Sequence, residues 1–398
     1  MPADTYEVTP STRDHTRAMP ALFTGAAMIN AAISGASAVA TIVAADRLGA
    51  GWGGLPNVAA ISGTGLGALM VTAVMGRRGR RAGLVVGYLC ATAGAALAVF
   101  AVAHNDVAGL SLGMLCIGLG NAAAGLSRYV AAELYPPRRR GFAIGVLTWA
   151  GTVGAVGGPL LLGPAAAAAT RLGGAAALGP LVLAALAAGV AVLAATAAPA
   201  TVVEHGGPAA KVRPLLAMPT VRSAFAVMAT AQLVMIAVMT AAPLDMHLHG
   251  HGLGEVGAVL SAHTLGMFAL SPLTGRLVDR VGTRPVMLGG LLTLSLAAVL
   301  TAANTHTQPR AVALLLLGYG WNLCFIGGST QLTQNLPQSQ CVQVEGAVDS
   351  GIWSIAAIAG LGSTAILATG GYPALAGLAI LAVIPSALLV SRTATTSS

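Results

Sequence analysis

Methionine and histidine side chains gather in one apolar stretch of this 398-residue sequence, residues 232–272. The stretch holds four of the eight histidines and four of the thirteen methionines. Two pairs have helical spacing, because Met235 and Met239 form an MxxxM pair and His263 and Met267 form an HxxxM pair. Residues four apart lie on one face of a helix, so each pair presents two side chains together.

These side chains have the chemistry of a site for a soft metal ion. Thioether and imidazole ligands, with no carboxylate among them, favour Cu(I) over Mg²⁺, Ca²⁺ or Mn²⁺. The alternative is structural, since methionines fill gaps in helix packing and a buried histidine finds a hydrogen-bond partner. An ionisable side chain in the middle of a membrane is costly and is more often functional, which favours the metal interpretation.

The elements that position these residues are predicted to be membrane-spanning helices. Hydrophobic residues make up 56% of the chain and charged residues only 8%, with a mean hydropathy of +0.81. Soluble domains carry about a quarter charged residues. Many windows of about 20 residues hold no charge, and this length crosses a bilayer core of ~30 Å. The sequence therefore predicts an all-α, multi-pass membrane protein embedded in a lipid bilayer.

Apolar runs between charged turns predict twelve transmembrane helices. The predicted spans are 20–45, 55–75, 83–103, 107–132, 141–164, 176–198, 222–245, 254–277, 286–304, 311–334, 346–369 and 372–391. Residues 199–221 hold Pro, Gly and the single lysine, and are predicted to be a cytoplasmic linker. The linker separates two six-helix halves, 20–198 and 222–391. Residues 1–19 and 392–398 are predicted cytoplasmic tails.

The distribution of basic residues predicts the orientation. With both termini in the cytoplasm, 16 of the 20 basic residues fall in inner turns and three, Arg47, Arg171 and Arg310, in outer turns. This bias is typical of the positive-inside rule. The arginines are thus a topology signal, and no nucleic-acid partner is expected. Residues 1–19 contain no apolar run of a cleavable signal peptide.

Several turns carry motifs. The turn after span eight reads GRLVDRVGTRP, and the turn after span two reads TAVMGRRGRRAG, with Gly76 where the first motif has an acid. ELYPPRRRG follows span four, and GAVGGPLLLG lies in span five. These motifs are similar to those of the major facilitator superfamily. The resemblance implies a transporter, not an enzyme, whose two six-helix halves rock around a midplane site. It leaves the substrate open.

Within that superfamily, the MxxxM and HxxxM pairs in helices seven and eight resemble those of the CcoA-like copper importers. The resemblance implies that Met235, Met239, His263 and Met267 bind copper as a transported substrate, either free or as a small chelate. The copper would cross the bacterial inner membrane and supply cytochrome oxidase assembly. At 1.5 Å per residue, the four side chains lie ~9–20 Å below the outer surface, around the middle of the bilayer. No cofactor is expected.

An organic substrate is the alternative. The related branch includes riboflavin uptake proteins, and the motif in span five resembles one found in drug efflux proteins. Aromatic residues make up only 4% of the chain, which leaves few rings to stack on a planar compound. A metal-dependent membrane enzyme or sensor is a third class, but the sequence has no HExxH motif to support it.

The outer turn between spans seven and eight, MHLHGHG, holds a second candidate cluster. Its members are Met246, His247, His249 and His251. A glycine-flanked cluster at this position is predicted to collect copper before it enters, and the alternative is a solvated polar turn.

Three further residues are candidates for steps towards the cytoplasm. Cys324 and Cys341 are positioned to pass Cu(I) to cytoplasmic copper acceptors, although lone cysteines are often small buried hydrophobes. Asp349, about one turn into span eleven, is a candidate for proton coupling. The alternative for Asp349 is a capping or pairing role near the inner surface.

Overall fold

The computed structural model describes residues 12–49, 52–198, 212–248, 253–303, 307–336 and 338–392, and within these ranges all regular structure is helical. The elements are α1 (Thr12–Leu48), α2 (Leu55–Arg78), α3 (Arg80–Ala103), α4 (Val107–Glu133), the 3₁₀ turn η2 (Pro137–Arg139), α5 (Arg140–Leu160), α6 (Leu162–Arg171), α7 (Leu178–Thr196), α8 (Val212–Leu216), α9 (Pro219–Leu248), α10 (Leu253–Phe268), α11 (Ser271–Val281), α12 (Thr283–Ala303), α13 (Thr307–Asn335) and α14 (Gln338–Arg392). Ten stretches of the described helices are long and apolar enough to cross a membrane.

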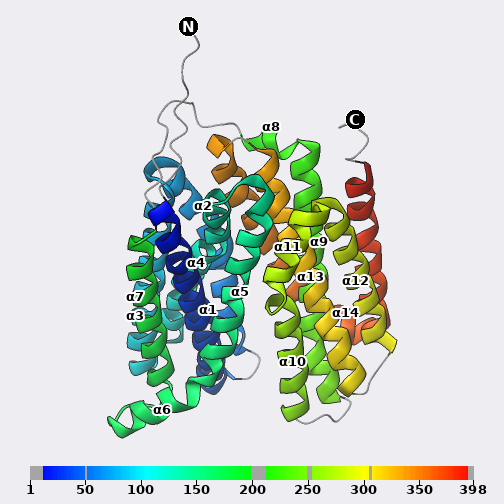
Figure 1. Ribbon diagram of the computed structural model, residues 1–398. Coiled ribbons are helices and arrows are strands. Elements are labelled where there is room, and N and C mark those ends of the chain that lie inside the picture. The colour runs from blue at the N-terminus through cyan, green and yellow to red at the C-terminus, as the bar shows by residue number, and fades with distance from the viewer. Residues whose placement is uncertain are drawn as a thin grey trace.

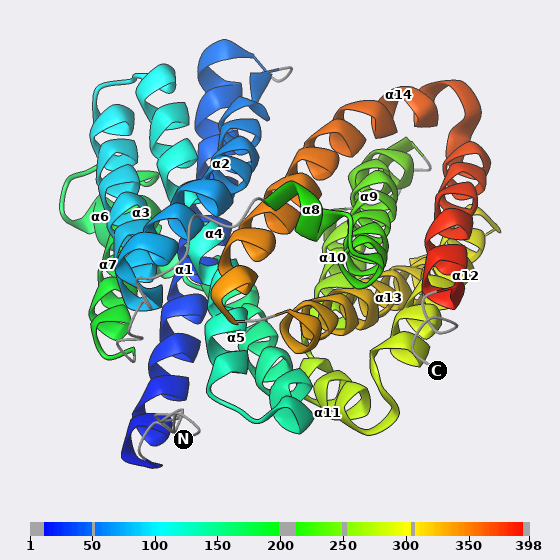
Figure 2. The ribbon, with the colours of Figure 1, turned by 90° about the horizontal axis from the view of Figure 1, so that it is seen from above.

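The helices form two bundles that stand side by side (Figure 1). In the first, α4 packs against α2 and α3, and α1 packs against α5 and α7. In the second, α13 contacts α9, α10 and α12, and α14 packs against α9. The bundles meet where α2 contacts α14 and where α5 contacts α11, as the view along the helices shows (Figure 2). The predicted all-α membrane fold of two six-helix halves is confirmed.

One end of the molecule carries both chain ends. Helix α8, in the segment that connects the two halves, lies at the same end, and α6 lies at the opposite end (Figure 1). We call the first of these the terminal end. It is the end that the distribution of basic residues predicts to face the cytoplasm.

Helix α14 contains the last two predicted spans. Gly371 interrupts it with φ +63° and ψ −168°, so the chain changes direction between residues 369 and 372, where the sequence predicts a boundary. Glycine adopts a positive φ at little cost because it has no Cβ atom.

Span eight, predicted as one helix over 254–277, is instead two helices. Helix α10 ends at Phe268 and α11 begins at Ser271. Pro272 lies in the first turn of α11, and its ring nitrogen cannot donate a hydrogen bond to the preceding turn. The helix therefore restarts at the proline.

Span five, predicted over 141–164, is also interrupted. Helix α5 ends at Leu160 and α6 continues to Arg171, beyond the predicted end. The interruption follows Pro159, which removes one backbone donor from the last turn of α5. Helix α6 then points away from the bundle (Figure 1).

Small residues bring α10 and α13 into backbone contact. A Cβ atom added to Gly266 would lie 2.1 Å from the carbonyl oxygen of Leu315, and one added to Gly318 would lie 2.3 Å from the carbonyl oxygen of His263. Such close approach is typical of membrane helices, which pack through small residues. It places His263 directly against α13.

The contact between α5 and α11 has the same construction. A Cβ on Gly275 would lie 2.2 Å from the carbonyl oxygen of Gly141, and one on Gly145 would lie 2.3 Å from that of Ser271. The two halves of the protein therefore touch here through their backbones.

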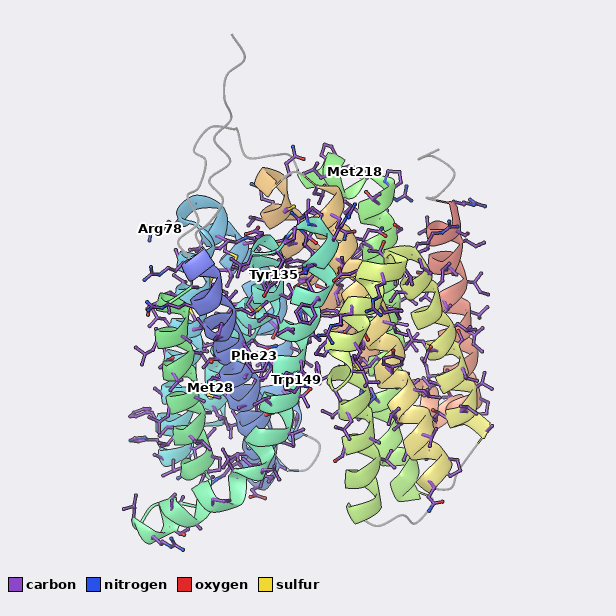
Figure 3. All side chains as sticks on the ribbon, in the orientation of Figure 1. Phe23, Met28, Arg78, Tyr135, Trp149 and Met218 are labelled. Carbon is purple, nitrogen blue, oxygen red and sulfur yellow. The ribbon has the colours of Figure 1, made fainter. Side chains whose placement is uncertain are left out.

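Aromatic packing also positions α5. The rings of Phe23 on α1 and Trp149 on α5 lie with centroids 5.7 Å apart and are tilted by 45° (Figure 3). This distance is within the range at which aromatic pairs stabilise a fold. The pair fixes α5 against α1 and thus sets the position from which α5 meets the second half.

Candidate functional site

The three methionines of the two pairs share one apolar cluster in the second half. Met235 is buried within the cluster, and Met239 and Met267 pack against it. Leu314 and Trp321 of α13 belong to the same cluster. The structure therefore places thioethers from α9 and α10 in one cluster, and both helices pack against α13.

His263 is buried and oriented by the backbone of α13. Its Nδ1 lies 3.0 Å from the carbonyl oxygen of Leu314. Because a carbonyl only accepts hydrogen bonds, Nδ1 carries the proton and Nε2 carries the lone pair. Histidines that bind metals have this arrangement, in which the second ring nitrogen donates to a carbonyl or carboxylate. A packed, non-functional histidine satisfies the same bond, so the bond defines the tautomer and not the role.

The interruption of span eight begins one residue after Met267, at the end of α10. The carbonyl oxygen of Met267 accepts a hydrogen bond of 2.6 Å from Nδ2 of Asn322, which also donates to Oγ of Ser271 at 2.6 Å. Asn322 thus satisfies a backbone group at a point where the helix is interrupted. Non-helical backbone at membrane depth is tolerated where protein groups satisfy it, and transporters use interrupted helices to form substrate sites.

A chain of aromatic rings leads from this interruption to the interface between the halves. Phe268 meets Trp321 edge-on, with centroids 6.0 Å apart, and Trp321 stacks on Phe325 at 4.5 Å. The guanidinium of Arg128, from α4 of the first half, lies 4.3 Å from the Phe325 centroid. Nε1 of Trp321 donates to Oε1 of Gln232 at 2.8 Å, which fixes the indole. The low aromatic content of the sequence predicted few rings for stacking on a substrate, but three aromatic residues lie together at this interruption.

Arg128 and Asp349 form a buried ion pair across the interface. Nη2 of Arg128 lies 2.7 Å from Oδ1 of Asp349, and the two residues are 3% and 5% exposed. Nε of Arg128 donates to Oγ of Ser329 at 3.0 Å, and Nη2 also donates to the hydroxyl of Tyr129 at 2.8 Å. Paired and hydrogen-bonded in this way, the guanidinium is held in an apolar environment that would otherwise exclude it.

A second ionic cluster lies nearer the terminal end. Buried Arg80 pairs with Oε1 of Glu133 at 2.5 Å and with Oε2 of Glu345 at 2.7 Å. Glu345 belongs to α14, so this cluster also joins the two halves. Gly76, in the last turn of α2, occupies the motif position of an acid, and the link to α14 is made by Arg80 instead.

Asp279, in the turn motif after span eight, binds the start of α5. Its two carboxylate oxygens accept hydrogen bonds of 2.8 Å each from the backbone N–H groups of Gly141 and Phe142. The first N–H groups of a helix lack partners within the helix, so the carboxylate satisfies two of them from the opposite half. Partial burial raises the pKa of Asp279 above its ordinary value. The two hydrogen bonds lower this pKa, but their effect is smaller than that of burial.

All hydrogen bonds and ion pairs seen between the halves, within the described ranges, lie between the level of Asp349 and the terminal end. Beyond the contacts above, Arg140 donates to the carbonyl of Thr333, and Gln334 donates to that of Pro137 at 3.1 Å. In this conformation the halves are therefore joined at the terminal end. Opening a path to that end requires these contacts to separate.

The remaining predicted residues are placed as follows. The side chains of Met246 and His247, in the last turn of α9, lie outside the described part of the chain, as do His249 and His251 entirely. Cys324 and Cys341 are both buried free thiols.

The two cysteine thiols point to backbone carbonyls. Sγ of Cys324 lies 3.7 Å from the carbonyl oxygen of Met287, and Sγ of Cys341 lies 3.4 Å from that of Leu336. Each cysteine therefore has a local packing and hydrogen-bonding role in this conformation.

The sequence left a pairing role open for Asp349 but did not identify Arg128 as its partner. A signal for it exists, because span four carries one arginine and span eleven one aspartate, and each is costly in a membrane without a partner. The role of Asp279 as a cap on α5 was equally unpredicted, although its motif was noted. Its partners are backbone groups, which leave no trace in the sequence.

Comparisons with known proteins agree with this architecture. Residues 223–397 match the Major Facilitator Superfamily. The "Uncharacterized MFS-type transporter YddS" of Bacillus subtilis (strain 168) is 31% identical over 332 residues, which cover 78% of this chain and 76% of that protein. The "Riboflavin transporter RfnT" of Brucella anthropi is 31% identical over 135 residues, which cover 34% of each chain.

A solved structure shares the fold over nearly its whole length. The human organic anion transporter MFSD10 superimposes with a TM-score of 0.79 and 15% identity, covering 94% of this chain and 99% of that one. At this identity the similarity concerns the fold alone. The extended match to YddS, at 31% identity over 78% of this chain, is what shows the family. This chain belongs to the major facilitator superfamily and is a multi-pass secondary transporter rather than an enzyme.

Proposed function

We propose that this transporter carries copper, as Cu(I), into the cell across the bacterial inner membrane by alternating access. The observation that supports this best is the position of the helix interruption, which begins one residue after the HxxxM pair of His263 and Met267. A substrate site formed at an interrupted helix is common in secondary transporters. Three thioethers and an imidazole at such a site would suit a soft, dehydrated cation.

In this proposal Met235, Met239, His263 and Met267 hold the ion. The Nδ1–H bond to Leu314 leaves the Nε2 lone pair of His263 for copper. Copper released towards the cytoplasm would serve cytochrome oxidase assembly through cytoplasmic acceptors.

The proposed orientation places the terminal end in the cytoplasm. The basic turns of α2–α3, α4–α5 and α11–α12 all lie at that end, which agrees with the positive-inside rule. Reporter fusions at Gly206, in the linker, and at Gly250, in the turn after α9, should report opposite sides of the membrane. A report of the same side from both would overturn this topology.

Alternating access then assigns a role to the contacts between the halves. Release into the cytoplasm requires Arg128 and Asp349 to separate, together with the Arg80–Glu345 and Asp279–α5 contacts. A proton taken up by Asp349 would remove its charge and weaken the pair with Arg128, and Asp349 is therefore the proposed site of proton coupling.

The test is uptake of radioactive copper by cells that express single variants at equal membrane levels. Met235→Leu removes the sulfur and keeps most of the volume, and we expect uptake to fall by about tenfold or more, the size of a lost ligand. Met228→Leu is the matched control, because Met228 is a buried methionine two turns earlier on α9 that belongs to the other core cluster.

His263 offers a sharper pair of variants. His263→Asn retains a donor near the position of Nδ1, which can still bind Leu314, but removes Nε2. His263→Gln places an amide near the position of Nε2 and loses the bond to Leu314. Copper binding predicts that His263→Asn is folded and inactive. Full copper uptake by His263→Asn and Met235→Leu would overturn the copper proposal.

A planar organic compound, taken up or exported, is the second candidate substrate. One observation favours it, namely the stacked rings of Trp321 and Phe325 beneath the guanidinium of Arg128. Stacking on aromatic rings and a cation is a common way to hold a planar ring. The partial similarity to a riboflavin transporter agrees with this candidate.

The two candidates respond to different variants. For an organic substrate, Trp321→Leu abolishes uptake of riboflavin by cells that lack other uptake systems, and Met235→Leu has no effect. For copper as the substrate, Met235→Leu lowers copper uptake and Trp321→Leu has no effect. The measurement therefore assigns the substrate class, provided that neither variant alters protein abundance.

A further inference from the structure

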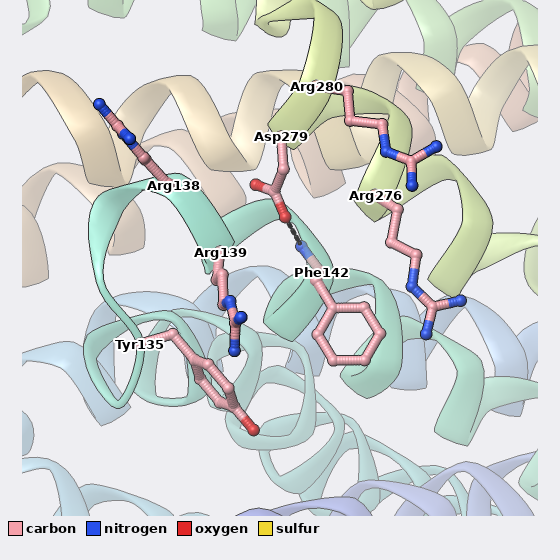
Figure 4. Close-up of a pocket in the computed structure, with 7 residues that line it drawn as sticks. All are labelled: Tyr135, Arg138, Arg139, Phe142, Arg276, Asp279 and Arg280. Carbon is pink, nitrogen blue, oxygen red and sulfur yellow. Dashed lines mark hydrogen bonds between the residues drawn. The ribbon is translucent and has the colours of Figure 1, made fainter.

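A pocket of about 470 Å³ opens at the terminal end, between the two halves and away from the candidate substrate site (Figure 4). The η2 turn and the start of α5 form one side, and α11 forms the other. The pocket is lined by Tyr135, Arg138, Arg139, Phe142, Arg276, Asp279 and Arg280. Nothing in the proposed transport mechanism uses the four arginines.

The charge in this pocket is almost entirely positive. All four arginines are exposed, and none makes an ion pair within 4.0 Å among the described residues. Asp279 is the single acid of the lining, and both its oxygens accept backbone hydrogen bonds from Gly141 and Phe142. The lining therefore carries four guanidinium groups and one carboxylate, which is already engaged.

One of the arginines is held over a ring of the lining. The guanidinium of Arg276 lies 4.9 Å from the centroid of Phe142, a cation–π contact that restricts its position. Figure 4 shows Arg139 and Arg276 on either side of Phe142. Arg280 lies next to Arg276, and the side chain of Arg138 points away from the pocket. Arg139, Arg276 and Arg280 therefore form the part of the lining best placed to contact one ligand.

We propose that this arginine pocket binds a phosphate group, either on the headgroup of an anionic phospholipid or on a soluble phosphate compound. Guanidinium groups bind phosphate through paired, charge-assisted hydrogen bonds. Basic pockets between membrane helices bind phospholipid headgroups, and the rings of Tyr135 and Phe142 suit the boundary between headgroups and acyl chains.

The pocket is also specific to one conformation. Arg139 comes from the first half and Arg276 and Arg280 from the second, so the lining is complete only while α5 and α11 are in contact. A ligand that binds one conformation better than another shifts the population towards it. The phosphate ligand therefore stabilises the state in which the halves are joined at the terminal end.

The experiment measures the thermal stability of the purified, full-length protein as a phosphate compound is added. One arm adds phosphatidylglycerol to detergent micelles, with phosphatidylcholine as the uncharged reference. A second arm adds inorganic phosphate at constant ionic strength, balanced by chloride. The pocket variant is Arg276→Gln/Arg280→Gln. The matched control is Arg77→Gln/Arg78→Gln, which removes two exposed charges from the α2–α3 turn at the same end.

We expect phosphatidylglycerol or phosphate to raise the Tm of the native and control proteins alike. The pocket variant should need about tenfold more ligand for the same shift, the effect of losing charge-assisted bonds. A response to phosphatidylglycerol alone identifies a lipid headgroup, and a response to inorganic phosphate identifies a soluble ligand.

Two results would overturn the proposal. One is the absence of any shift in the native protein with either compound, and the other is an equal shift in the pocket and control variants, which would indicate non-specific attraction. If the double variant does not fold, Arg276→Lys serves in its place. It keeps the charge but loses paired hydrogen bonding, so weaker binding by a stable Arg276→Lys protein supports the site, and unchanged binding contradicts it.

Discussion

Arg128 and Asp349 lie 221 positions apart in the sequence, yet Nη2 of the arginine is 2.7 Å from Oδ1 of the aspartate at the interface between the two halves. The pair is inaccessible to solvent from either side in this conformation, since the residues are 3% and 5% exposed. It is thus both a structural contact and a contact that transport has to break.

Removing one partner of this pair should destabilise the protein strongly. Asp349→Asn leaves the guanidinium of Arg128 without a counter-charge, and Arg128→Gln leaves the carboxylate without one. We expect each to cost about 3–5 kcal/mol. Thermal or denaturant unfolding in detergent measures this cost. The double variant Arg128→Gln/Asp349→Asn should recover a large part of the loss, and a double variant no more stable than the singles would show that the pair is not coupled.

Replacing Gly318 by alanine should separate α10 from α13. The added Cβ would lie 2.3 Å from the carbonyl oxygen of His263, and overpacking of this kind costs about 1–3 kcal/mol. Gly289→Ala, on α12 of the same half, is the matched control, because nothing lies within 4 Å of its added Cβ. That change should be neutral or stabilising, by up to about 1 kcal/mol. Equal Tm values for the two variants would contradict the close backbone contact.

The conformation in which Asp279 contacts α5 should gain population in acid. Burial raises the pKa of Asp279 in the joined conformation, so this conformation binds a proton more tightly than one in which the carboxylate is solvated. As the pH falls through the raised pKa, the joined conformation gains population. Distances between spin labels at exposed Arg81 and Val281 measure that population. Asp279→Asn should remove this part of the pH dependence, and a wild-type shift towards separation in acid would contradict the prediction.

The outer histidines are expected to tune copper uptake without being essential to it. His247, His249 and His251 are predicted to lie in a hydrated turn, where water and buffer compete for the ion, whereas the ligands within the membrane meet dehydrated copper. Replacing the three by Asn should lower uptake mainly at limiting copper. If the triple variant is as inactive as His263→Ala at every copper concentration, the essential site is at the outer mouth.

Much of the fold follows from apolar runs and turn residues. The predicted boundary between residues 369 and 372 coincides with the positive φ of Gly371, because a glycine pair separates two long apolar stretches. The interruption of span eight was not predicted, although Pro272 signalled it. The run 254–277 is apolar on both sides of the proline, and hydropathy alone does not register a change in helix direction.

The candidate site was predictable only in part. Helical spacing indicated that Met235 and Met239 share a face, and the structure adds that α13 is their common neighbour with His263 and Met267. Neither Asn322, which satisfies the Met267 carbonyl, nor the stack of Trp321 on Phe325 follows from local periodicity. Both depend on which helices become neighbours, a property of the whole arrangement.

The glycine contact between α5 and α11 has a thermodynamic consequence. A Cβ on Gly275 would lie 2.2 Å from the carbonyl of Gly141, so at this point the two backbones meet with no side chain between them. Parting the helices at this point exposes polar backbone and little hydrocarbon, and the heat capacity of a protein rises mainly with exposed hydrocarbon. This part of the opening step therefore has a small change in heat capacity, and its contribution to the free energy of opening changes little with growth temperature.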